Sequence, residues 1–126
     1  MILPDGNILI AFKHLNHADH PKAKVFFSKN PKVATCPITE LNLVRGLMQL
    51  GYTGREADSL LADFIAKYRS QLVPANISAE KIKGLCHGHR ETTDAYLARL
   101  AQAHDLKVGT LDKSFARKFS DIVELI

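Results

Sequence analysis

Residues 1–12, MILPDGNILIAF, place a single carboxylate, that of Asp5, between two short apolar runs. The first run stops at Pro4, and because proline has no backbone N–H to donate, a first strand must end or lie unpaired there. The second run, Ile8–Phe12, suits a buried helix, although it is too continuous to show a period. The stretch therefore predicts that Asp5 lies at the edge of a sheet, where a strand ends and its helix begins.

Short strand-like runs alternate with helical stretches along the whole chain. The clearest helix, Ala57–Tyr68, carries apolar residues at i, i+3, i+4, i+7, i+8 and i+11, which is one face of a 3.6-residue period. Such β–α alternation is typical of an α/β domain in which a parallel sheet lies between helices. The expected strands are residues 1–3, 32–35, 71–74, 106–111 and 121–126, and the expected helices are 7–15, 20–30, 37–50, 57–68, 79–86, 92–104 and 113–119.

Length and composition define the class of protein. A chain of 126 residues suits one domain, residues 1–126, and no run approaches the ~18 apolar residues of a transmembrane helix. The start of the chain lacks the basic region and cleavage site of a signal peptide, so a cytoplasmic location without a membrane anchor is expected. Cys36 and Cys86 lie far apart and are expected to be reduced thiols.

Four acidic residues follow predicted strands at equivalent places. Asp5 and Asp112 come directly after a strand, whereas Glu40 and Asp94 lie in the first turn of a helix. The carboxyl ends of parallel strands meet at one edge of a sheet, so these carboxylates are expected to converge. Converging carboxylates need cations, and Mg²⁺ or Mn²⁺ in such sites promotes hydrolysis of phosphodiester bonds by a metal-activated water. The chain has 17 Lys and Arg against 13 Asp and Glu, four of which are these acids, so the remaining surface is basic enough to hold a polyanion.

A simpler interpretation of each acid stays open at this point. An acidic residue in the first turn of a helix interacts favourably with the helix dipole, and Asp is a common turn residue at strand ends. Taken singly, any of the four has a structural explanation. Only their occurrence as a set favours a metal site, and spacing alone does not decide between the two interpretations.

Four stretches of the chain resemble the PIN-domain ribonucleases, in particular the VapC toxins of VapBC toxin–antitoxin pairs. They follow one another in the family's order and span nearly the whole length. The stretches are LPDGNILIAF (3–12), HADHPKAKVFF (17–27), TCPITELNLVRGL (35–47) and HRETTDAYLARLAQAHDLKVGTLDKSFAR (89–117). The resemblance implies a three-layer α/β/α PIN-like domain with a central, mainly parallel sheet.

The same resemblance implies an activity and partners. The expected protein is a Mg²⁺- or Mn²⁺-dependent endoribonuclease that cleaves structured RNA, often tRNA or rRNA, acts as a homodimer and is inhibited by a VapB-type antitoxin. The family's acidic motif falls on Asp5, Glu40, Asp94 and Asp112, with Asp5 and Asp94 as the usual metal ligands and Asn7 as a supporting residue. Gly6 departs from the pattern, because the family often has Thr or Ser there.

Basic residues near these motifs are candidates for contact with RNA. Arg45 is five residues beyond Glu40, about 140° away on a helix, so a direct salt bridge with that acid is not implied. The resemblance, in which a basic residue near this point often lies by the site, makes Arg45 a candidate for phosphate contact, with a surface or dimer role as the alternative. The other candidates, for which a solvated surface is the alternative, are His87, His89, Arg90, Lys113 and Arg117.

Two histidine-rich stretches lack the paired spacing of a zinc site and are expected to be solvated loops. They are the group His14, His17, Asp19 and His20, and the motif CHGH at residues 86–89.

Two alternatives to a nuclease remain. One is a non-catalytic PIN-like module that binds RNA or protein, which the missing hydroxyl at Gly6 mildly favours. The other is a Mg²⁺ phosphotransfer fold of the receiver or phosphatase type, which is disfavoured because no second Asp stands two residues after Asp5. In either nuclease or module, the apolar face of Ala57–Tyr68, with Leu43, Leu47 and Leu50, is large enough that part of it is expected to form a dimer or antitoxin interface.

Overall fold

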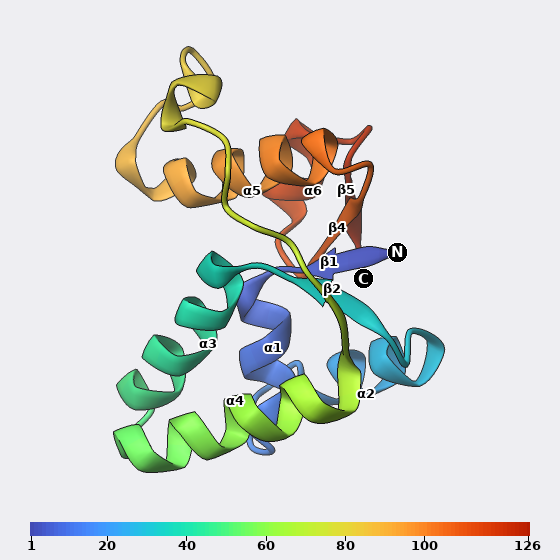
Figure 1. Cartoon of the computed structure of the whole chain (residues 1–126), viewed down its shortest axis with the longest axis vertical. Helices are drawn as coiled ribbons and strands as arrows, with labels where there is room; N and C mark the ends of the chain where they lie inside the picture. Colours follow the sequence, from blue (N-terminus) through green and yellow to red (C-terminus); the bar gives the residue numbers. More distant parts are fainter.

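Five short strands form the centre of the molecule in two parallel groups (Figure 1). β1 (Ile2–Pro4), β4 (Lys107–Thr110) and β5 (Val123–Leu125) form a three-stranded sheet in the order β1-β4-β5. β2 (Val33–Thr35) pairs with β3 (Arg69–Leu72), and all pairings in both groups are parallel. The carboxyl ends of the strands therefore point the same way within each group, as the β–α alternation predicts.

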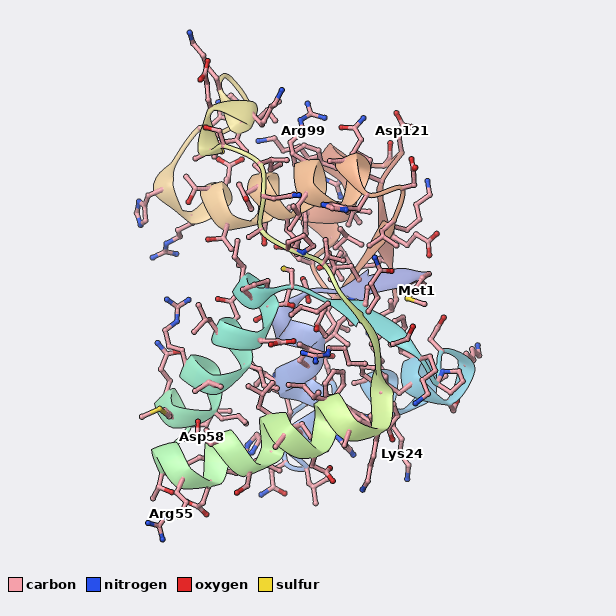
Figure 2. The ribbon with its side chains drawn as sticks, in the orientation of Figure 1. Met1, Lys24, Arg55, Asp58, Arg99 and Asp121 are labelled. Atoms are coloured by element: carbon pink, nitrogen blue, oxygen red, sulfur yellow. The ribbon has the colours of Figure 1, made fainter.

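Helices cover both faces of the strands, which makes the predicted three-layer α/β/α arrangement (Figure 1). The computed structural model describes residues 1–126. Four helices lie on one side and two on the other, and Arg55 on α4 and Arg99 on α5 mark the two opposite outer surfaces (Figure 2). The first group is α1 (Gly6–Lys13), α2 (His20–Lys29), α3 (Pro37–Gln49) and α4 (Gly54–Tyr68), and the second is α5 (Thr92–Ala103) and α6 (Lys113–Lys118).

Each helical layer has its own hydrophobic core against the strands. Leu97 and Phe115 pack with Leu3 on the side of α5 and α6, whereas Leu43 and Phe64 belong to the core formed by α1 to α4. Burial of each such side chain stabilises the fold by about 1.5–3 kcal/mol. No helix combines the length and the hydropathy needed to cross a bilayer.

Local signals set the ends of several helices. Pro37 occupies the first turn of α3, and Gly51, just after its end, has a φ of 102°, a left-handed value that glycine adopts without strain. Thr53 and Glu56 form a reciprocal capping box at the start of α4, with each side chain accepting from the other residue's backbone N–H. These helices accordingly begin and end within a few residues of the predicted positions.

The expected helix at 79–86 is wrong. Ser78 does cap it, by accepting from the Glu80 backbone N–H at 3.1 Å, but the segment forms only a short 3₁₀ turn, η1 (Ala79–Ile82). A second 3₁₀ turn, η2 (His89–Glu91), follows. Gly84 has a φ of 80°, which interrupts the helix, and the segment buries no side chain that would stabilise a longer one.

Candidate active site

Asp5 lies at the junction between β1 and α1 and is almost fully buried. Its backbone N–H donates to the Gly109 carbonyl at 2.9 Å, which continues the β1–β4 pairing by one residue. One carboxylate oxygen caps α1 by accepting from the Ile8 N–H at 3.1 Å, and the other accepts from the Thr110 hydroxyl at 2.6 Å. Burial raises the pKa of Asp5, an effect that the Thr110 hydrogen bond opposes and the nearby charge of Asp112 reinforces.

Asp112 lies at the end of β4 and caps the next helix. Its Oδ1 accepts from the backbone N–H groups of Ser114, at 2.8 Å, and Phe115, at 3.2 Å. Its own backbone N–H donates to the Thr110 hydroxyl oxygen at 3.0 Å. The buried Thr110 side chain therefore connects two of the predicted acids, because it donates to one and accepts from the backbone of the other.

Asp94, in the first turn of α5, completes a group of three interacting carboxylates. Burial and the charges of Asp5 and Asp112 raise the pKa of Asp94 to about 6, and no hydrogen bond offsets them. Carboxylates from three separate segments of the chain are thus close enough to repel one another. The convergence expected from the strand ends is present for these three acids.

Two hollows meet at Asp94. We call the first the α3 hollow, of about 250 Å³, and the second the α6 hollow, of about 220 Å³. Asp94 and Arg90 line both hollows. An extended ligand that occupied both would therefore pass these two side chains. The α3 hollow is also lined by Asp5, Gly6, Asn7, Asn42, Arg45, Thr93 and Gln49, and the α6 hollow by Asp112, Ser114, Lys118 and Phe119.

Glu40 does not join the other three acids in this structure. Its carboxylate accepts from the Thr35 hydroxyl at 2.5 Å and from Arg69 Nη1 at 3.1 Å, in a largely buried ion pair. Glu40 lines neither hollow. The expectation that all four carboxylates share one rim is therefore met by three of them. The carboxylate of Glu40 is bound instead by Thr35, at the end of β2, and by Arg69, at the start of β3.

The candidate RNA-contacting residues separate into two groups. Arg45 and Arg90 line the α3 hollow beside Asp5 and Asp94, as does Asn7, the expected supporting residue. The others are exposed and line neither hollow, although they lie in the segments on either side of the α6 hollow. These others are His87, His89, Lys113 and Arg117.

The first histidine-rich stretch, His14 to His20, is occupied by structural hydrogen bonds. His14 Nδ1 is 2.8 Å from the Tyr52 hydroxyl, His20 Nδ1 is 2.9 Å from the Ala11 carbonyl, and His17 Nδ1 accepts from a backbone N–H. The simple loop interpretation is thus the better one for this stretch. Cys36 and Cys86 are free thiols, as expected.

The carboxylates fit a hard divalent cation, although they do not form a closed cage. No three His, Cys, Asp or Glu side chains stand close enough together to hold a metal ion unaided. Mg²⁺ does not require such a cage, because it is usually bound by one or two carboxylates, with water and substrate phosphate completing the set. The mutual repulsion at Asp94 is what a cation would relieve, so Asp5 and Asp94, with Asp112 nearby, suit Mg²⁺ or Mn²⁺.

Sequence reasoning missed two features of the site. Thr110 is one, although a hydroxyl two residues before an Asp at a strand end is a recognisable turn signal. The other is the reason for Gly6: a Cβ there would lie 2.5 Å from Cβ of Asn42, so the close approach of α1 and α3 leaves no room for the Thr or Ser of the expected pattern.

Comparisons with known proteins agree with this fold. The family model of the PIN domain matches residues 2–119. Ribonuclease VapC29 of Mycobacterium tuberculosis (strain ATCC 25618 / H37Rv) is 34% identical over 128 residues, which cover 99% of this chain and 96% of the relative. Ribonuclease VapC44 of the same strain is 29% identical over 90% of this chain and 87% of its own length. Among solved structures, VapBC2 from Rickettsia felis, bound to a DNA fragment from its promoter, has a chain that superposes with a TM-score of 0.67 at 19% identity, over 100% of this chain and 99% of that one.

Proposed function

Because this chain belongs to the PIN-domain family and is similar over its whole length to VapC ribonucleases, we propose that it is the toxin endoribonuclease of a toxin–antitoxin pair. The reaction is hydrolysis of RNA phosphodiester bonds. The observation that carries the proposal is the meeting of Asp5, Asp94 and Asp112 beside two hollows that also contain Arg45 and Arg90. Acids to bind a cation next to arginines to bind phosphate are what such a reaction needs.

The cation we propose is Mg²⁺ or Mn²⁺, held by Asp5 and Asp94 with Asp112 beside them. When bound, such an ion neutralises negative charge on the phosphate and favours ionisation of a water for attack on phosphorus. Glu40 would join this set only after its carboxylate leaves Arg69. Asn7, at the start of α1, lines the α3 hollow beside Asp5, from where its side chain would support that acid.

The chain's own side chains prepare the site before any ion arrives. Thr110 fixes one oxygen of Asp5 and the backbone N–H of Ile8 fixes the other, so the carboxylate has one orientation. Arg45 and Arg90 would bind the RNA phosphates on either side of the cut. The exposed residues His87, His89, Lys113 and Arg117 would make outer contacts with the RNA backbone.

The partners we propose are those of the VapC relatives. The substrate is a structured cellular RNA, with tRNA and rRNA as the first candidates, and the protein would act on it in the cytoplasm. A VapB-type antitoxin would inhibit it, and the active form would be a homodimer. Ile65 and Leu61 on α4 are only partly buried, which leaves the outer side of that helix available for one of these contacts.

Incubation of the purified protein with total RNA tests the function directly. We expect discrete cuts in the presence of Mn²⁺, mapped at their new ends, and none with EDTA. The variant Asp94→Asn should cut nothing, whereas Asp58→Asn, which changes an exposed aspartate on α4 (Figure 2), should cut like the wild type. Retained cleavage by Asp94→Asn would contradict the assignment of this site, and RNA binding without any cleavage would favour the non-catalytic module.

A further inference from the structure

One wall of the α3 hollow is a row of polar side chains on α3. Asn42, Arg45, Gly46 and Gln49 occupy i, i+3, i+4 and i+7, which is one face of the helix. Gly46 packs against α1, whereas Arg45 and Gln49 on the same face are exposed. This face carries two carboxamides and an arginine next to the proposed catalytic acids, which suits the binding of a polar ligand.

Close packing holds this polar face in place. The Cβ of Asn42 lies where a side chain at position 6 would go, and a Cβ at position 46 would lie 2.2 Å from the Ile10 side chain. Gly6 and Gly46 thus allow α1 and α3 to pack closely, and this packing fixes the position of the Asn42 Cβ. Arg45 Nη2 also donates to Asn42 Oδ1 at 3.3 Å, which leaves the amide N–H₂ of Asn42 free to donate into the hollow.

The hollow has the size and charge for one nucleotide. Its volume of about 250 Å³ is below the ~300–1,000 Å³ of a complete small-molecule site, so it suits part of a longer ligand. The ion pairs of the structure use lysines and Arg69, so the guanidinium groups of Arg45 and Arg90 are available for phosphate. Asn42 offers its N–H₂ donors, and Gln49 offers both donors and an acceptor, which finds a partner on the edge of a nucleobase but none on a phosphate.

We propose that the α3 hollow is a base-reading subsite, in which Asn42 and Gln49 hydrogen-bond the base of one unpaired nucleotide directly beside the cut. This inference rests on the proposed ribonuclease function. The base must be unpaired, because a base within a duplex cannot offer its edge to a hollow of this kind, and specific recognition of RNA generally uses exposed bases.

The α6 hollow has no matching carboxamides. It is lined instead by residues such as Ser114, Phe119 and Lys118, whose ammonium is paired with Glu91 at 2.6 Å, so the ring of Phe119 is the group that suits contact with a base. Stacking on an aromatic ring tolerates any base, since every base has a π-face. Sequence preference is therefore expected on one side of the cut and tolerance on the other.

The test is the base composition around the cuts in a randomised single-stranded RNA library, in Mn²⁺, measured by sequencing of the new ends. The wild type should show a preference at one position on one side of the cut. In Asn42→Ala and Gln49→Ala, we expect the ratio of the most to the least favoured base at that position to fall by roughly tenfold, since a good base contact contributes discrimination of about that order. Gln102→Ala, which removes an exposed carboxamide on α5, is the matched control and should keep the wild-type profile.

The readout separates base recognition from stability, because a damaged fold slows cleavage at all sequences equally and leaves the ratio unchanged. A synthetic RNA with an abasic nucleotide at the preferred position has no base for Asn42 to contact. The wild type and Asn42→Ala should therefore cut this RNA at the same slow rate. If wild-type cleavage shows no preference, or both variants keep it, the inference is overturned while the ribonuclease function stands. If the wild type cuts no RNA, the proposed function itself fails and the subsite fails with it.

Discussion

The substitution Asp94→Asn should stabilise the metal-free protein while it removes activity. Burial and the charges of Asp5 and Asp112 raise the pKa of Asp94 from 3.8 to about 6, so ionisation of this group costs the folded state free energy. At about 1.4 kcal/mol per pH unit, that difference corresponds to about 3 kcal/mol. Asp94 is only partly buried, and solvent screening reduces the expected gain to about 1–2 kcal/mol at neutral pH.

The sign of the pH dependence follows from the same shift. Below pH 4 the group is protonated in both the folded and the unfolded chain, so the variant gains nothing. Between pH 4 and about 6 the folded protein holds a proton that the unfolded chain has released, and the wild type loses stability as the pH rises through this window. Asparagine does not titrate, so the stability difference should grow across that window and stay constant above it.

Urea unfolding in EDTA at pH 4 and pH 7.5 measures the effect, and thermal melts give a second reading of about 3–5 °C per kcal/mol for a chain of this size. Asp58→Asn is the control and should match the wild type at both values. Mn²⁺ should then raise the melting temperature of the wild type but not that of Asp94→Asn, because a ligand stabilises only a fold that binds it. An unchanged or lower stability of Asp94→Asn at pH 7.5 would refute the reasoning that the three carboxylates repel one another.

Three further substitutions test other parts of the structure. Thr110→Val removes the hydroxyl that donates to Asp5, so we expect a loss of about 1–3 kcal/mol in urea unfolding, and an unchanged midpoint would argue against that hydrogen bond. Gly6→Ser restores the hydroxyl of the family pattern but forces its Cβ toward Asn42, so it should lower stability by about 1–3 kcal/mol rather than increase RNA cleavage; higher activity at equal stability would contradict the close packing. Ile65→Glu places a charge on the outer side of α4 and should shift the protein toward monomers in light scattering, whereas an unchanged dimer mass would exclude that surface.

The parallel pairing of the strands and the convergence of three of the acids were accessible from the sequence for one physical reason. Parallel strands end at a common edge, so residues that directly follow strands, such as Asp5 and Asp112, come together whatever the details of packing. Asp94 is one helical turn removed, yet its place in the first turn of α5 constrains it almost as strongly. Periodicity and end signals likewise located the helices that bury an apolar face.

The features that sequence did not reveal depend on long-range partners. Glu40 has the same local signature as Asp94, but Arg69, 29 residues further on, binds it, and nothing near Glu40 in the chain indicates that partner. The segment from residue 79 to 86 has a helix cap without a buried face, so it stays a short turn. Gly6 looked like a missing hydroxyl, and only the position of Asn42 shows that the backbone needs the space.

The hydrogen bond between Thr110 and Asp5 joins residues 105 positions apart, and this has a consequence for the order of events during translation. The ribosome adds Asp5 about 105 residues before it adds Thr110, the residue of β4 that orients the Asp5 carboxylate. At about 5–20 residues per second, the nascent polypeptide waits roughly 5–20 s before that partner is available. A nascent chain in which β4 is not yet made therefore lacks the hydrogen bond that orients Asp5, so the proposed site cannot assemble before that strand is available.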